Sequence, residues 1–498
     1  MGRHRQRACV RILLLALLVP RAFPADAAVD VPVPGEPGVS AGDLRYHARA
    51  TAFRHGETEA RAEFFIRIPY REIRFVAAGD RFEAHLRLTA ELLRKDGKRV
   101  AYERREARVA STDADATVDS LLGEVYTLGL VAPRGRYHYS LTVEDMNQAR
   151  RGLVYQMKNK KKQGEVRGEI DMGAWLFQNP ALSGIEFAWN VGPATPETPF
   201  ARGPYEIPPH PSGYYGHFRD VLSAYYEIYD APAPSEGRAY RLRTMILGAR
   251  GDTLMNEVDS LRVAEGIAWP HVVSADIAAL PAGHYLLRLD LFREAGQPAA
   301  GSQAEFDVLW DPQSWNSDAV DVFDITAATI MTGKQATSFR QLSRGEKEAT
   351  LANTWRSIDP TPDTAENELR RTLLARIAYA NAHFTIYEKG MFSDRGRTWI
   401  RYGEPDEILD ERLPVSESTL GYVIQGQIPK SSSDMLSRGD TGVVDERPYQ
   451  IWWYTLRGHE IVPQHAMNEI SSGMKFVFVD DQGYGEYVLR YSSVSGIR

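Results

Sequence analysis

Residues 133–143 read PRGRYHYSLTV, and residues 281–291 read PAGHYLLRLDL. In each stretch a Pro-x-Gly-x-Tyr turn leads into side chains that alternate between apolar and polar, which is the period of a β-strand with one buried face. Earlier in each region, GDRF at residues 79–82 corresponds to GRAY at residues 237–240, again before a strand pattern. Because both motifs recur in the same order, the sequence predicts two tandem immunoglobulin-like β-sandwiches.

The two expected sandwiches cover residues 44–168 and 169–309. Within the first, residues 82–88 read FEAHLRL, which alternates as a strand does, and Asp96-Gly97 is a hairpin-turn signal shortly after it. The apolar content of the whole chain is 43% and its charged content 25%, which are ordinary values for globular proteins. Its 498 residues are enough for several cores.

From residue 310 the pattern changes to helices. Ser343 and Glu346 form a capping box before a helix that ends near Ser357, and Asp363 with Glu366 is the expected start of a second helix. The apolar stripe of this second helix consists of Leu369, Leu373, Ile377, Ala380 and Phe384. After Gly390 strand patterns return, at residues 399–402, 451–454 and 475–479. Residues 310–498 are therefore expected to form an α+β domain, which makes the chain multidomain and mainly β. Residues 408–447 are expected to form a long polar loop that is either functional or mobile.

The N-terminus has the pattern of a secretory signal peptide. Four arginines precede a short apolar run at residues 12–19, and a small-x-small site follows at residues 25–27. We expect residues 1–27 to be removed and residues 28–43, which are rich in Pro and Gly, to form a flexible leader. The single cysteine, Cys9, lies in the removed part. The expected location is therefore the periplasm, the cell envelope or the extracellular space, with no transmembrane segment after cleavage.

The charge balance argues against nucleic acid as a partner. The formal net charge of the full sequence is −7. Residues 1–27 contain five Arg and one Asp, so the remainder has a net charge of −11. Residues 150–162 are a basic exception, and we interpret them as a solvated linker or hairpin, with an anionic partner as the alternative.

Familiar catalytic and metal-binding motifs fail on inspection. The G-x-S-x-G match at residues 38–42 lies in the Pro/Gly leader, away from any strand-to-helix turn. His459 and His465 are six positions apart with Pro463 between them, so they do not share a helix face as zinc peptidases require. The acidic run at residues 113–124 lacks the glycine of a calcium loop. We therefore expect no metal ion and no cofactor.

The densest polar constellation lies at residues 390–407. We interpret it as a helix stop, an Asp-Arg-Gly turn, a strand and a second turn. We expect Arg395 and Arg397 to pair with Asp394, Glu404 or Asp406, which would make a structural polar network. Two other interpretations stay open: general acid/base chemistry by Asp394 with Glu404, and ligand recognition.

This constellation resembles the GWxTD domain of exported bacterial proteins, and the resemblance covers residues 310–495. The matching stretches are DPTPDT at residues 359–364, RIAYA at 376–380, DRGR at 394–397, YGEPDE at 402–407, YQIW at 449–452 and FVDDQGYG at 478–485. Met391 stands where the naming motif has Trp, and Ser393 stands where it has Thr. The family has no established biochemical activity, so the resemblance implies a domain type and export but no reaction.

The sequence therefore favours an exported, non-enzymatic envelope protein that binds a protein or a glycan. The candidate binding residues are Asp394, Arg395, Arg397, Glu404, Asp406, Glu407, Trp452 and Trp453. Paired tryptophans in a strand are also typical of a core, so that interpretation stays open. The alternative function is an envelope hydrolase that uses Asp394, Glu404 and His465.

Overall fold

The structure is a computed structural model. It describes residues 38–119, 121–147, 162–195, 199–230, 238–263, 268–293, 298–364, 366–414, 420, 447–463 and 473–494. The expected signal peptide at residues 1–27 lies outside the described residues, as does His465. The same holds for most of the expected leader, of the basic segment and of the 408–447 loop.

The described chain is mainly β, as predicted, and it divides into two compact units. The first unit consists of the chain up to Val320 together with residues 342–349, and the second of residues 321–341 and 350–498. The predicted domain boundaries at 168/169 and 309/310 stay predictions. Among the described residues, no helix is long and apolar enough to cross a membrane.

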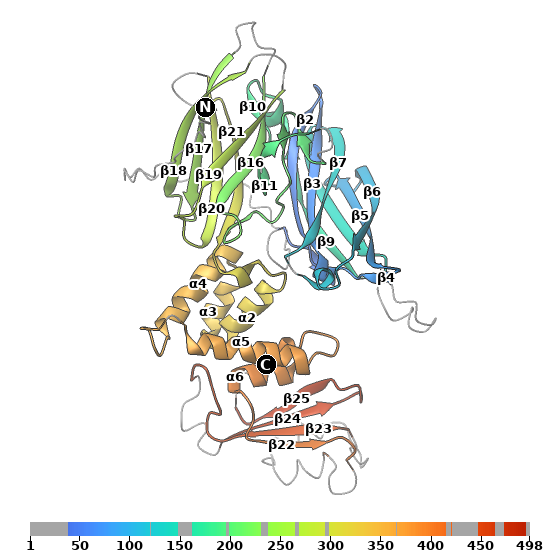
Figure 1. Ribbon diagram of the computed structural model, residues 1–498, viewed down its shortest axis with the longest axis vertical. Coiled ribbons are helices and arrows are strands. Elements are labelled where there is room, and N and C mark those ends of the chain that lie inside the picture. The colour runs from blue at the N-terminus through green and yellow to red at the C-terminus, as the bar shows by residue number, and fades with distance from the viewer. Residues whose placement is uncertain are drawn as a thin grey trace. The chain divides into compact units, whose positions relative to one another are not determined.

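The first unit begins with two antiparallel sheets that enclose one apolar core, here called the first sheet pair (Figure 1). One sheet has the order β2–β3–β7, with β2 at His47–His55, β3 at Glu59–Pro69 and β7 at Gly123–Pro133. The other has the order β1–β9–β8–β5–β4, and β6 also pairs with β5. Its strands are β1 (Ala41–Gly42), β4 (Val76–Ala78), β5 (Arg81–Leu93), β6 (Arg99–Ser111), β8 (Gly135–Asp145) and β9 (Gln163–Met172). The predicted strand at residues 82–88 and the hairpin turn at Gly97, whose φ is +80°, are both confirmed.

The second sheet pair follows in the same unit and has its own core. One sheet has the order β10–β16–β11, with β19 also paired to β16, and the other has the order β15–β21–β20–β17–β18. The strands are β10 (Ala181–Leu182), β11 (Glu186–Ala188), β15 (Tyr214–Gly216), β16 (Val221–Tyr229), β17 (Arg238–Gly248), β18 (Thr253–Val263), β19 (Ala268–Asp276), β20 (Gly283–Phe292) and β21 (Ala300–Leu309). A small sheet adds β12 (Gly192–Pro193), β13 (Ala201–Arg202) and β14 (Tyr205–Glu206).

The repeated Pro-x-Gly-x-Tyr motif makes the same contact in both sheet pairs. The Tyr137 hydroxyl donates to the Pro133 carbonyl over 2.7 Å, and the Tyr285 hydroxyl donates to the Pro281 carbonyl over 2.8 Å. Each tyrosine thereby fixes the entry into its strand, β8 or β20, with its ring folded over the intervening glycine. The strands predicted after both motifs are confirmed.

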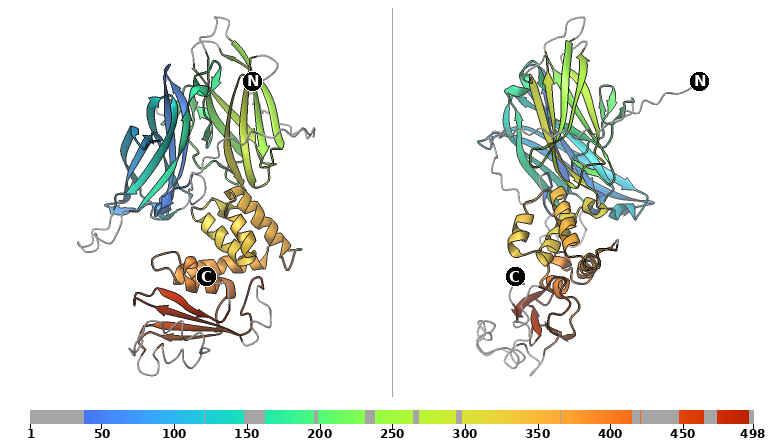
Figure 2. Two further views of the ribbon diagram at one scale, coloured as in Figure 1. Left: turned by 180° about the vertical axis from the view of Figure 1, so that it is seen from behind. Right: turned by 90° about the vertical axis from the view of Figure 1, so that its left-hand side faces the viewer.

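The rest of the chain contains five helices and one four-stranded antiparallel sheet among the described residues. The helices are α2 (Ala319–Ile330), α3 (Gly333–Phe339), α4 (Arg344–Ser357), α5 (Glu368–His383) and α6 (Asp394–Tyr402). The sheet has the order β22 (Glu407–Glu411), β23 (Tyr449–Tyr454), β24 (Met474–Asp480) and β25 (Tyr487–Ser492). Both views of Figure 2 show α5 and α6 on one side of this sheet, where Trp399 of α6 packs against Trp452 of β23.

Two of these helices were predicted. The capping box of α4 is confirmed, since the Ser343 N–H donates to the Glu346 carboxylate over 2.9 Å and the Glu346 N–H to the Ser343 hydroxyl over 3.3 Å. The core stripe of α5 is confirmed by the burial of Leu373, Ile377 and Ala380. However, α5 begins after Asn367, whose side chain caps the Arg370 N–H over 2.9 Å, and not after Asp363.

The strand predicted at residues 399–402 is wrong, because these residues end the helix α6. Four residues with a high β-propensity fit both a strand and one turn of a helix. The stronger signals were the Ser393 cap before the helix and Gly403 after it, where φ is +79°. The helices α2 and α3 were not predicted.

Candidate functional site

The motif segment is held together by two glycines that allow the backbone to approach closely. A Cβ atom at Gly390 would overlap the Ala380 carbonyl oxygen of α5, and a Cβ atom at Gly396 would overlap the Gly390 carbonyl oxygen. Met391, at the tryptophan position of the motif, is fully buried, and its N–H donates to the Asn381 side chain over 3.0 Å. This position therefore serves as an apolar plug in the core.

Ser393 connects the turn to the helix. Its hydroxyl donates to the Gly390 carbonyl over 2.7 Å and accepts from the Gly396 N–H over 3.0 Å, which caps α6. A hydroxyl is sufficient for both bonds, so serine in place of threonine keeps the function of the motif position.

Asp394 connects the start of α6 to the edge strand β25. One carboxylate oxygen accepts from the Leu489 N–H over 2.7 Å, and the other accepts from the Arg397 guanidinium over 3.3 Å. An acidic side chain in the first turn also interacts favourably with the helix dipole. The predicted pairing of Arg397 with Asp394 is therefore present.

The guanidinium of Arg395 lies against two aromatic rings. It stands 5.1 Å from the centre of the Phe384 ring and 4.2 Å from that of Tyr487. It donates to the Gly485 carbonyl over 3.2 Å and to the Gln450 side chain over 3.4 Å. Burial lowers the pKa of Arg395. Arg395 thus holds the β24–β25 turn against α6, instead of pairing with one of the predicted carboxylates.

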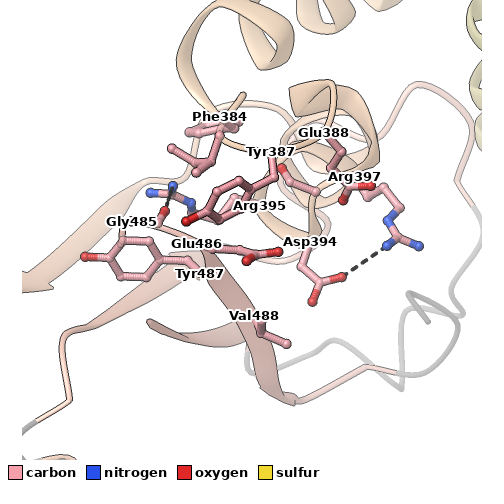
Figure 3. Close-up of a pocket in the computed structure, with 12 residues that line it drawn as sticks. Phe384, Tyr387, Glu388, Asp394, Arg395, Arg397, Gly485, Glu486, Tyr487 and Val488 are labelled. Carbon is pink, nitrogen blue, oxygen red and sulfur yellow. Dashed lines mark hydrogen bonds and ion pairs between the residues drawn. The ribbon is translucent and has the colours of Figure 1, made fainter. Parts of the chain in front are cut away.

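These contacts form the walls of a pocket of about 140 Å³ at the start of α6. Figure 3 shows Phe384, Tyr387 and Glu388 on one side, Glu486, Tyr487 and Val488 on the other, and Asp394 with Arg395 between them. The rim carries two exposed apolar side chains: Tyr387 is 71% exposed, and Ile386 is 45% exposed. Glu388 and Glu486 form no ion pair with another described residue, so their carboxylates are available at the mouth.

The other predicted site residues lie elsewhere. Glu404 is exposed beyond the far end of α6, which spans about 12 Å from Asp394 to Tyr402 at 1.5 Å per residue. Asp406 accepts from the Thr455 N–H and hydroxyl over 2.6 and 2.9 Å, and these bonds lower the pKa of Asp406. Glu407 is exposed at the start of β22. The structure therefore brings Asp394, Arg395 and Arg397 together, but not the two carboxylates Asp394 and Glu404.

The two tryptophans point to opposite faces of β23. Trp452 is 1% exposed and packs against Phe384, Trp399 and Phe478, so it is a core residue. Trp453 is partly buried on the other face, where Lys475 approaches its ring at 5.7 Å. His465 lies outside the described residues. In the described part of the chain, no group of three or more His, Cys, Asp or Glu side chains is placed to hold a metal ion.

Sequence reasoning missed the pocket residues outside the motif. Ile386, Tyr387 and Glu388 follow α5 in a loop without a familiar pattern. Glu486 and Tyr487 lie about 90 residues beyond Arg395, and only the hairpin β24–β25 brings them to it. The one available signal was the DQGYG stretch at residues 481–485, a sharp turn with positive φ at Gly483 and Gly485.

Comparisons with solved structures give only distant similarities. One is red sea bream transglutaminase, with a TM-score of 0.17, 9% identity, and coverage of 53% of this chain and 31% of that one. Another is Bacteroides uniformis β-glucuronidase, with a TM-score of 0.18, 11% identity, and coverage of 50% and 26%. A third is a glycosyl hydrolase family 2 member from Bacteroides cellulosilyticus, with a TM-score of 0.19, 8% identity, and coverage of 50% and 28%. Each comparison spans less than a third of the other protein.

No curated protein matches the chain. The family comparison does match, and it falls on the helices and the motif segment described above. Residues 324–416 fit the family model of the GWxTD domain, from within α2 to just beyond β22. The chain is therefore a GWxTD domain-containing protein.

Proposed function

We propose that this chain is an exported binding protein whose GWxTD domain captures a side chain of a protein partner in the pocket at the start of α6. The observation that supports this proposal most directly is that hydrogen bonds hold the walls of the pocket in place, while its rim is exposed. Asp394 and Arg395 are engaged in structural bonds, while Tyr387 stands free at the mouth with 71% of its surface exposed. Exposed aromatic residues beside a small pocket are typical of protein-recognition hot spots.

The size of the pocket supports a single anchoring side chain. A cavity of about 150 Å³ holds one benzene ring, so a pocket of about 140 Å³ has room for one side chain. The exposed apolar surface of Ile386 and Tyr387 would cover the backbone on either side of that anchor. In this proposal the two sheet pairs are tandem immunoglobulin-like sandwiches that carry the binding domain. The tyrosine bond shared by β8 and β20 supports that assignment, because a tyrosine that binds backbone a few residues upstream is typical of such sandwiches.

The test is selection of random peptides displayed on phage against the full chain, with counter-selection against the Tyr387→Ala variant. The Tyr102→Ala variant is the matched control, because Tyr102 is a partly exposed tyrosine on β6. We expect peptides that bind the parent and the control at least tenfold better than Tyr387→Ala. If glycans on an array bind the parent but not Tyr387→Ala, the partner is a glycan and not a protein. If neither peptides nor glycans discriminate Tyr387→Ala from the control, the pocket is not a binding site.

Export is tested separately. In a bacterial host that recognises the leader, we expect the protein in the periplasm or medium with Ala28 as its first residue, which follows from the small-x-small site. N-terminal sequencing of the purified protein checks this. A retained residue 1–27 segment on the isolated protein would contradict it.

The hydrolase alternative has less support. It requires Asp394 and Glu404 to face one substrate, and paired carboxylates in glycosidases lie within about 10 Å of each other. Asp394 is the first of the nine residues of α6 and Glu404 lies beyond its last residue, so the length of the helix separates the two carboxylates by more than that.

A further inference from the structure

His47 lies at the contact between the first and the second sheet pair. It is the first residue of β2 and is 7% exposed. In the β2–β3 register it stands directly opposite Arg67. Its ring packs edge-on against Tyr214 of β15, in the second sheet pair, with 5.2 Å between the ring centres. One imidazole therefore touches both sheet pairs of the first unit.

The charged and titratable groups around His47 are mainly cationic. From β3 comes Arg67, and from the first turn of α4 comes Arg344, which is 2% exposed and lies 4.7 Å from the centre of the Tyr214 ring. From the segment before β15 comes His210, which is also buried and contacts the Tyr214 carbonyl. On the strand of His47 itself, Arg49 donates to the Glu305 carbonyl over 2.9 Å.

Neither ring nitrogen of His47 has a hydrogen-bond partner among the described residues. A neutral imidazole tolerates this position at a moderate desolvation cost, but a protonated one would face Arg67 across the strand pair and Arg344 across Tyr214. Burial lowers the pKa of His47 well below its usual value, and Arg344, Arg67 and His210 lower it further.

We propose that His47 makes this junction acid-labile: protonation of the imidazole opens the contact between the two sheet pairs and the start of α4. An exposed histidine has a pKa of about 6.5, whereas the closed junction depresses it. The open state therefore binds a proton that the closed state does not. Opening becomes favourable by about tenfold per pH unit below pH 6.5, and the closed state is fully stable above it. This inference does not depend on the pocket at α6.

The experiment is hydrogen–deuterium exchange on the full chain at pH 7.5 and pH 5.5, corrected for the intrinsic pH dependence of exchange. It compares the parent, His47→Phe, which keeps a neutral ring, and His55→Phe, an exposed control at the other end of β2. We expect the rise in β2 and β15 exchange from pH 7.5 to pH 5.5 to be about tenfold larger in the parent and the control than in His47→Phe. An equal rise in all three proteins would overturn the proposal.

A second measurement needs no variant. NMR titration of ¹³C-labelled histidines in the parent reports the protonation of His47 directly. We expect its signal to titrate together with the change in β2 exchange. A His47 signal that titrates near pH 6.5 while β2 exchange stays constant would also overturn the proposal.

Discussion

At the residue scale, Asp394 is a structural connection between α6 and β25. Replacing it with alanine leaves the buried Leu489 N–H without its acceptor. We expect Asp394→Ala to lower the free energy of unfolding by about 1–3 kcal/mol. For a unit of this size, that corresponds to a Tm lower by about 2–4 °C per kcal/mol. Differential scanning calorimetry of the full chain measures the change.

The matched control for Asp394 is asparagine, which keeps an acceptor oxygen but loses the charge. Because the Asp394 side chain is 25% exposed, its ion pair with Arg397 contributes little, and Asp394→Asn should retain most of the stability. If alanine is as stable as asparagine, the bond to Leu489 does not hold the helix to the strand.

Glu186 should make the stability of the first unit depend on pH. It lies on β11, where Arg202 approaches both Glu186, over 3.1 Å, and Glu63 of β3. Burial raises the pKa of Glu186 to about 8. Its unfolded pKa is about 4.3, so the folded state keeps a proton that the unfolded state has lost between these values. The stability from this group is fully present below about pH 4.3 and is lost as the pH rises to about 8.

Glu186→Gln checks this prediction, because glutamine stays neutral at every pH. We expect the difference in Tm between the variant and the parent to grow in favour of the variant from pH 5 to pH 8. The contribution of Glu186 to stability falls as the pH rises, whereas that of His47 rises, so the two contributions are separable. A constant difference between these pH values would mean that Glu186 is ionised throughout.

The sequence identified the residues of the motif as a group because they are close together in the chain. Asp394, Arg395 and Arg397 lie within one turn of chain, so the sequence identified them together. The partners that decide their roles, Leu489 and Tyr487, come from a strand more than 90 residues away. The sequence alone does not show which distant residues lie next to each other in the folded chain. For this reason, the partners predicted for Arg395 were wrong.

At the scale of elements, the observed start of α5 can be compared directly with the predicted one. The Asn367 side chain accepts from the Arg370 N–H and donates to the Trp355 carbonyl at 2.9 Å, so it joins the end of α4 to the start of α5. We expect Asn367→Ala to cost about 1–2 kcal/mol. Asp363→Ala, at the position that the sequence favoured, should change stability by less than about 0.5 kcal/mol. Urea unfolding of the two variants measures both values, and a larger cost at Asp363 would contradict the observed cap.

Element types were predicted best where a pattern extended over many residues. Buried and less buried residues alternate along β5, and the buried residues of α5 form a stripe over several turns. The first pattern fits only a strand and the second only a helix. The short helix α6 has only nine residues and a mixed composition, and its end resembles a strand. The helix α2 is rich in Val, Ile and Thr, which favour strands, and α3 has only seven residues, so neither shows a clear helical pattern in the sequence.

At the scale of the whole molecule, the two compact units should unfold separately, because each has its own core. Calorimetry of the full chain should resolve two transitions. Asp394→Ala and Asn367→Ala should lower one of them, and Glu186→Gln should shift only the other. A single transition that responds to all three variants would show that the units unfold as one.

The chain passes between the two compact units three times, after residues 320, 341 and 349. The first residues of α4 therefore complete the unit of sheets: Arg344 donates to the Ser314 and Asn316 carbonyls, and the Gly345 N–H donates to Asp307. No single breakpoint in the gene separates the units intact. Recombination that moved this GWxTD domain to another protein would also remove residues 342–349 from the first unit. The two units therefore have to be transferred together to stay intact.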